Sequence, residues 1–393
     1  QLHNVTTYGA PSVIETIDTT GTISAGTYYA IYTNGKIGSL SGATISANYN
    51  ALLNSGAGAL ISYDYVRTYT SSTDSTTETK RTETYVRNLT DGGVIGSIDG
   101  VRFVGTGSNS YYLLQNQGRI DSLRSSDFTA ASPRAGEGYA LVLNGDSRQS
   151  GHTLTRPTYA YEALYITPYQ YHYDYDVATI GVIDGVTIQK NATFAFRNLG
   201  VIDELKNSEI TGTQYVLVNA VSGPYVSRDY VRYYSGASKF ATTRNNGSDL
   251  TYAYERIPAE IKTLENNTVT GTSTYTLYNG GTIRSFTSNL ADIITEVTAT
   301  DSACTVVYGS EARVNTTDYD APVIDQIGSG NKISGTYQVL VNLGQINAID
   351  GGEDPVTITA ATQKQIGGIY SYAGTLDQRV ATTPFTDGTA GTT

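Results

Sequence analysis

An apolar pair of the form i, i+3 recurs along the chain at two alternating distances. From its first member the next pair lies 23 residues on (14 to 37), then 58 (37 to 95), then 25 (95 to 120) and then 60 (120 to 180). The short step is one coil of a solenoid, and we interpret the long step as one coil plus an insertion. The pairs, which predict about ten coils of about 22 residues, are Ile14/Ile17, Ile37/Leu40, Ile95/Ile98, Ile120/Leu123, Ile180/Ile183, Ile202/Leu205, Ile261/Leu264, Ile283/Phe286, Ile324/Ile327 and Ile346/Ile349.

A short apolar strand that ends in asparagine precedes most of these pairs or their insertions. Asparagine tolerates left-handed backbone angles, so we predict that it forms the same sharp bend in every coil. Stacked Asn side chains can also hydrogen bond to the copies above and below. A ninth strand, TVVYG, ends in Gly309 instead. The predicted corner ladder is Asn34, Asn54, Asn116, Asn144, Asn198, Asn219, Asn279 and Asn342.

Composition supports an all-β solenoid. The 393 residues include 41 Gly and 33 Tyr, no Met and no Trp, and many β-branched side chains. Coils of three short strands with Gly-rich corners predict a single right-handed parallel β-helix domain over residues 1–393, whose apolar residues are buried only when the coils stack. A leucine-rich repeat is the competing fold, but its L-x-L-x-x-N/C-x-L core is missing.

The residue after each pair is expected to point outward, and in the middle coils it alternates in charge. Stacked opposite charges attract, with each neighbouring pair contributing about 0.2–1 kcal/mol. A column of carboxylates alone would instead favour catalysis or calcium binding. The predicted charge ladder is Asp99, Arg124, Asp184, Lys206 and Glu265.

The insertions are predicted at about 62–92, 146–177, 222–257 and 310–322, followed by a C-terminal arm at about 367–393. They leave the solenoid at the same corner and alternate Tyr with polar residues, which is the period of β-hairpins. The tyrosines either pack across strands or form a surface that stacks on sugar rings or docks proteins. The candidate recognition residues are Tyr161, Tyr165, Tyr169, Tyr171, Tyr173, Tyr230 and Tyr233.

Charge and residue usage exclude several function classes. The net charge is −11 and no basic stripe is present, which argues against nucleic-acid binding. No run of about 18 apolar residues is present to span a membrane. One cysteine, Cys304, and three histidines allow no disulfide framework and give little support to a Cys/His site, so no cofactor or metal is expected.

The beginning of the chain parallels a segment near its end. TTYGAPSVIETI at 6–17 matches TDYDAPVIDQI at 317–327. We therefore expect the repeat to continue across chain boundaries, either because the chain is an excised piece of a longer array or because subunits associate end to end.

The motifs YAIYTNGKIGSLSGATIS, YNGGTIRSF and YVLVN followed by IKTL resemble the Gly/Asn-rich coils of bacterial surface-repeat proteins, including adhesins and autotransporter-like passenger domains. That resemblance implies a parallel β-helix on the cell surface or outside the cell. It implies a non-catalytic stalk, adhesin or head-to-tail filament subunit, whose further partner would be a glycan or protein of a host or cell surface.

Two other functions remain open. Some right-handed β-helices are polysaccharide-degrading enzymes, which need clustered carboxylates. The nearest candidates here are DGGED at 350–354 and YHYDYD at 171–176. The other alternative is a phage tailspike-like fibre that binds glycans.

Overall fold

The structure is a computed structural model. It describes residues 1–71, 79–108, 110–133, 139–145, 151–161, 169–189, 194–219, 225–234, 247–257, 259–272, 276–279, 282–288, 296–299, 304–307, 315–320, 323–336, 339–350, 354–360 and 369–371. All regular elements within these ranges are β-strands.

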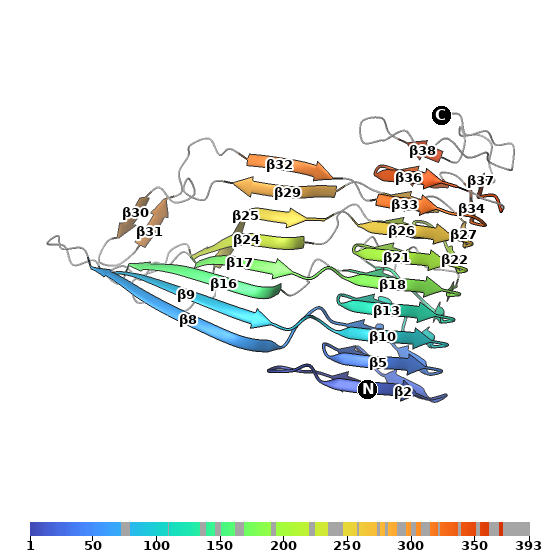
Figure 1. Cartoon of the computed structure of the whole chain (residues 1–393), viewed down its shortest axis with the longest axis horizontal. Helices are drawn as coiled ribbons and strands as arrows, with labels where there is room; N and C mark the ends of the chain where they lie inside the picture. The colour runs from blue at the N-terminus through green and yellow to red at the C-terminus, as the bar shows by residue number, and fades with distance from the viewer. Residues whose placement is uncertain are drawn as a thin grey trace.

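The coils stack into a solenoid whose walls are three long parallel sheets (Figure 1). Sheet I contains the apolar pairs, in the order β2 (Val13–Asp18), β5 (Lys36–Ser41), β10 (Val94–Asp99), β13 (Arg119–Arg124), β18 (Thr179–Asp184), β21 (Val201–Lys206), β26 (Glu260–Glu265), β33 (Val323–Ile327) and β36 (Gln345–Ile349). Sheet II follows it along the chain, in the order β3 (Thr22–Ala25), β6 (Thr44–Ala47), β11 (Arg102–Gly105), β14 (Asp127–Ala130), β19 (Thr187–Ile188), β22 (Glu209–Gly212), β27 (Thr268–Gly271), β34 (Lys332–Gly335) and β37 (Thr357–Ala360).

Sheet III contains the strands that end in asparagine. Its order is β1 (Leu2–Asn4), β4 (Ile31–Thr33), β7 (Asn50–Asn54), β12 (Tyr112–Asn116), β15 (Val142–Asn144), β20 (Phe196–Asn198), β23 (Leu217–Asn219), β28 (Leu277–Asn279), β35 (Leu340–Asn342) and β38 (Ile369–Ser371). The chain passes from sheet I to sheet II to sheet III and returns to sheet I at the asparagine. The prediction of a parallel β-solenoid is confirmed at this level.

Equivalent residues of successive coils lie directly over one another. Ile120 pairs with Ile95 on one side and with Ile180 on the other, and all three are fully buried. In sheet II the rings of Phe103 and Phe128 stack at 4.5 Å and are also fully buried. Because strand side chains alternate between faces, each coil directs apolar side chains into the interior of the solenoid. There they pack against those of the neighbouring coils in one continuous core.

A fourth, antiparallel sheet lies beside the solenoid, at the left of Figure 1. This arm sheet has the order β32 (Asn315–Asp320), β29 (Thr282–Ser288), β25 (Gly247–Arg256), β24 (Tyr225–Tyr234), β17 (Tyr169–Tyr175), β16 (Gly151–Tyr161), β9 (Thr79–Leu89) and β8 (Leu60–Ser71). The hairpins β16–β17 and β24–β25 lie within the second and third predicted insertions, and β8–β9 fits the first except that it begins two residues earlier, at Leu60. The three hairpins pair with one another and form one shared sheet.

The fourth insertion is longer than predicted. Ile283 and Phe286 lie in β29 of the arm sheet and form no coil, and TVVYG overlaps β31 (Cys304–Val307), which forms a hairpin with β30 (Glu296–Ala299). The insertion therefore lies between β28, which ends at Asn279, and β33, which begins at Val323; β29 already belongs to it, so the predicted start at 310 is wrong. The apolar spacing was misleading because β29 pairs in antiparallel with β25 and β32, and spacing alone does not reveal which sheet a strand joins.

The predicted C-terminal arm contains β38, which pairs in parallel with β35 and extends sheet III. Residues 372–393 lie outside the described residues.

The predicted left-handed bend is at a different corner. Residues with positive φ follow the strands of sheet I, at Gly42, Gly100, Ser125, Gly185, Asn207 and Asn266. None of the described asparagines at the ends of sheet III strands has a positive φ, so the prediction of left-handed angles there is wrong. The short turn from sheet I into sheet II needs a left-handed residue. The asparagines at the return from sheet III to sheet I do not serve this purpose.

Candidate functional site

The asparagines that end the sheet III strands form an amide ladder along the solenoid. Each side-chain Nδ2 donates to the Oδ1 of the next, at 2.7–2.9 Å, in the order Asn54, Asn116, Asn144, Asn198, Asn219, Asn279 and Asn342. All seven are fully buried. Their amides also donate to backbone carbonyls at the corner, for example from Asn198 to Gly200 at 3.0 Å and to Glu260 at 2.9 Å. The ladder thus satisfies polar groups that the corner encloses.

Asn34 is not a member of this ladder. Thr33 occupies the register position beside Asn54, and Asn34 lies one residue beyond it, where its side chain bonds both the N–H and the carbonyl of Thr6. Asn4, which the sequence reasoning missed, is in register with Thr33 and donates to its Oγ1 at 3.2 Å. The signal for Asn4 was its position two residues before TTYGAP (6–11), the segment that resembles 317–322.

The amide ladder has a direction and two incomplete ends. In the described part of the chain, Oδ1 of Asn54 has no donor and Nδ2 of Asn342 has no acceptor, although both atoms are buried. At the first end the reason is local, because the hydroxyl of Thr33 hydrogen bonds with Gly35 instead of reaching Asn54.

The predicted charge ladder is in register. Asp99 pairs with Arg124, Arg124 with Asp184, Asp184 with Lys206, and Lys206 with Glu265 as Cα partners. The direct contacts are weaker than the register suggests. Arg124 lies 3.6 Å from Asp184, whereas Lys206 binds Glu204 of its own strand at 2.6 Å. The hydrogen bond that the Lys206 amine donates to the Glu204 carboxylate, followed by the charges of nearby carboxylates, raises the pKa of Lys206. Solvent screening keeps such surface pairs weak.

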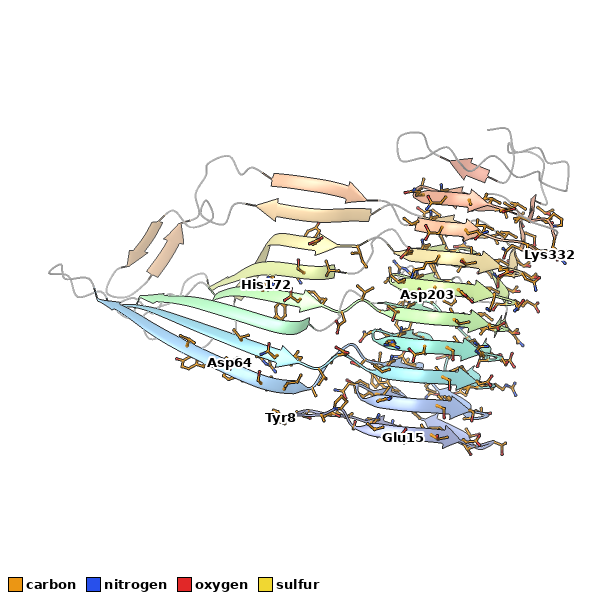
Figure 2. The ribbon with its side chains drawn as sticks, in the orientation of Figure 1. Tyr8, Glu15, Asp64, His172, Asp203 and Lys332 are labelled. Carbon is orange, nitrogen blue, oxygen red and sulfur yellow. The ribbon has the colours of Figure 1, made fainter. Side chains whose placement is uncertain are left out.

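A second group of charges lies on the outer face of sheet I near the C-terminal coils. Lys262 donates to Asp203 at 2.6 Å across neighbouring strands, and Figure 2 shows Asp203 on this side of the solenoid. Burial, and then the charge of Asp325, raise the pKa of the Glu260 carboxyl. No group of three or more His, Cys, Asp or Glu side chains among the described residues could hold a metal ion.

A shallow pocket of about 220 Å³ lies where the first two arms meet the solenoid. Asp91, Asp176 and Arg119 line it together with Gly92, Val94 and Gly118. Arg119 is already paired with Asp121 of the same strand at 2.5 Å. The small volume and this internal pairing leave little to select a ligand.

Four tyrosines form a column just before the sheet III strands β4, β7, β12 and β15. The centroids of Tyr28 and Tyr49 are 5.5 Å apart, those of Tyr49 and Tyr111 are 5.1 Å apart, and those of Tyr111 and Tyr139 are 4.9 Å apart. The sequence signal was available, since a Tyr stands three residues before the aligned core residue in each of these coils. Because the rings face one another, edges and hydroxyls form most of the surface that the inner rings can offer to solvent.

The predicted tyrosine surface of the arms is described only in part. The Tyr173 ring lies 6.0 Å from that of Tyr175, which is packing between residues i and i+2 on the same face of one strand. Tyr161, Tyr169, Tyr171, Tyr230 and Tyr233 lie on β16, β17 and β24, where Tyr171 and Tyr230 are direct partners, but their side chains are outside the described part, as is the whole of Tyr165.

The carboxylate candidates for catalysis are dispersed. In YHYDYD, His172 lies on the arm sheet at 3.1 Å from Asp174, two residues along the same strand (Figure 2). In DGGED, residues 351–353 lie outside the described residues, and Asp350 and Asp354 are on the loop between β36 and β37.

Within the described ranges, no helix is long and apolar enough to cross a membrane. No family model, curated protein or solved structure matches the chain.

Proposed function

We propose that the chain is a non-catalytic structural protein of the cell surface or extracellular space, a stalk, adhesin or filament segment built as a right-handed parallel β-helix. The observation that supports this proposal is the continuity of the repeats along the axis. The amide ladder, the charge ladder and the arm sheet all connect successive coils. Such repetition is expected of a long, stiff rod rather than of a protein with one localised binding or catalytic site.

The first coil offers a surface for end-to-end association. In the described sheets, β1, β2 and β3 each have a neighbouring strand on one side only. Leu2, Ile14, Ile17 and Ile23 pack against the core there but are only partly buried. An unpaired strand edge with apolar side chains is a template for another coil, and we propose that a second copy supplies it.

The test is the assembly state of the purified chain. Electron microscopy and sedimentation velocity over a concentration series should show rods that lengthen with concentration. Ile14→Asp should abolish the lengthening, because it places a charge where the next coil would pack. Thr16→Asp is the matched control, since Thr16 is exposed on the same strand. Circular dichroism should show both variants folded.

Two outcomes would contradict this function. Rods that stay monomeric at all concentrations would refute self-association, and turnover of a polysaccharide in a panel of pectins and other glycans would refute the non-catalytic assignment. Trimers that bind glycans without turnover would favour the tailspike-like alternative instead.

A further inference from the structure

The tyrosine column of Tyr28, Tyr49, Tyr111 and Tyr139 is held in place by the solenoid. The aligned core residues of β7, β12 and β15 are direct partners. The N–H of Tyr111 donates to the carbonyl of Tyr49 at 2.9 Å, so these two residues are locked side by side although 62 positions separate them in the sequence (49 to 111). Their ring planes are only 19° from parallel.

This column is open to solvent, unlike the stacked rings of the core. Tyr28 is 61% exposed, and Tyr49, Tyr111 and Tyr139 are half-buried. Phe103 and Phe128 stack just as closely but are fully buried. The phenols of the tyrosine column are therefore open to an oxidant in solution while the fold keeps the rings together.

We propose that this column is a site of dityrosine formation, with the first bond between Tyr49 and Tyr111. A peroxidase using hydrogen peroxide is the oxidant class. Each of two phenols loses one electron and one proton to give a phenoxyl radical, and the peroxide is reduced to two molecules of water. The ortho carbons of the two radicals form a carbon–carbon bond. The hydrogen on each of these carbons then moves to the ring oxygen, which restores both phenols.

Face-to-face stacking suits this coupling. The new bond forms from the π orbitals, which project from the faces of the rings, so two parallel rings with their centroids 5.1 Å apart are already oriented for it. Holding reactants in a near-attack geometry replaces a chance encounter by an intramolecular step and raises its rate by orders of magnitude. In an unfolded chain the same two residues would be separated by a long flexible segment.

The site has a natural comparison just before the sheet III strands β20 and β23. Phe194 and Tyr215 stack at 4.9 Å with planes 7° apart, but the pair has only one phenol and cannot form the product. The Tyr49–Tyr111 bond would close a loop that includes the whole first arm, β8 and β9. Such a loop closure restricts the unfolded state and stabilises the fold.

The experiment treats the dilute, folded 393-residue chain with a peroxidase and hydrogen peroxide, then maps cross-linked peptides by mass spectrometry. We expect a peptide pair joining Tyr49 to Tyr111, lighter by two hydrogen atoms than the sum of its parts, with dityrosine fluorescence and a raised melting temperature. In urea-unfolded chain the yield of this pair should fall about tenfold or more, since the fold supplies the proximity.

Tyr49→Phe preserves the ring stack and removes one phenol, so it should eliminate this pair and leave folding unchanged. Tyr173→Phe, on an arm strand outside the column, should leave its yield unchanged. The proposal is overturned if folded chain gives no Tyr49–Tyr111 link, or gives it in no greater yield than unfolded chain. It is equally overturned if the Tyr49→Phe variant still gives the cross-linked peptide pair that is assigned to positions 49 and 111.

Discussion

Interrupting the amide ladder at its centre should destabilise the solenoid strongly. Asn198 is fully buried and accepts from Nδ2 of Asn144 at 2.8 Å. It donates to Oδ1 of Asn219 at 2.9 Å, and the N–H of Gly200 donates to its Oδ1 at 3.2 Å. Asn198→Ala removes all of these bonds and leaves a small cavity.

The size of the destabilisation follows from the buried polar groups that lose a hydrogen-bond partner. Nδ2 of Asn144 keeps a bond to the carbonyl of Val201 at 3.1 Å, so that donor is partly compensated. Oδ1 of Asn219 and the N–H of Gly200 lose the partner that Asn198 provided. An unsatisfied buried polar group costs about 1–3 kcal/mol, so the expected loss of unfolding free energy is about 3–5 kcal/mol.

Equilibrium urea unfolding followed by circular dichroism measures this loss, and hydrogen exchange locates it. Because repeat proteins can unfold in parts, the exchange should accelerate most in the coils that contain β20 and its neighbours. Asn347→Ala is the control, since Asn347 is a half-buried amide on the outer face of sheet I and bonds Asp325 at 2.7 Å. Its expected effect is about 0.5 kcal/mol or less. Equal effects of the two variants would refute the reasoning about buried amides.

Three further predictions concern single positions. Thr33→Asn should stabilise the chain by about 1 kcal/mol in urea unfolding, because it supplies the donor that Oδ1 of Asn54 lacks; no gain would contradict the incomplete-end interpretation. Gly100→Ala should cost about 1–2 kcal/mol, because φ is +62° while nothing lies within 4 Å of an added Cβ; a neutral result would show that the corner can relax. Burial and Asp325 raise the pKa of Glu260, so this group's contribution to stability is full below the ordinary Glu pKa and is lost as the pH rises through the raised value. Glu260→Gln should therefore melt higher than the parent by a margin that grows between about pH 4 and pH 7, and a constant margin would contradict the assigned shift.

The coil repeat could be predicted because one physical requirement acts at every coil. A residue that fills the core in one coil lies over its equivalent in the next, so Ile120 and Ile180 had to be apolar at the same position. The hairpin arms were equally visible, since alternating Tyr and polar residues between coil motifs have the period of a strand. Both patterns extend over several residues, so an irregularity at one position does not hide them.

The missed features depend on single residues. Ile283 and Phe286 have the spacing of a coil pair, yet they belong to the arm sheet, where β29 pairs in antiparallel with β25 and β32. Asn34 follows the same kind of strand as Asn54 but is displaced by one residue, and a displacement of one moves a strand side chain to the opposite face. The tyrosine column needed the alignment of sheet III before its members could be recognised.

The asparagines of this chain solve two different problems, which explains why sequence reasoning merged them. Asn207 and Asn266 have φ of 51° and 50° at the turn into sheet II, where glycine stands at the same place in other coils, and the Nδ2 of Asn266 bonds Oδ1 of Asn207 on the exposed surface. Asn144 and Asn198 have no left-handed angle and are fully buried. Backbone freedom selects the first set, so glycine can replace it, whereas a side chain that both donates and accepts is required in the second. The same residue type therefore marks a conformational requirement at one corner and a hydrogen-bonding requirement at the other, and the backbone angle and the burial of each position tell them apart.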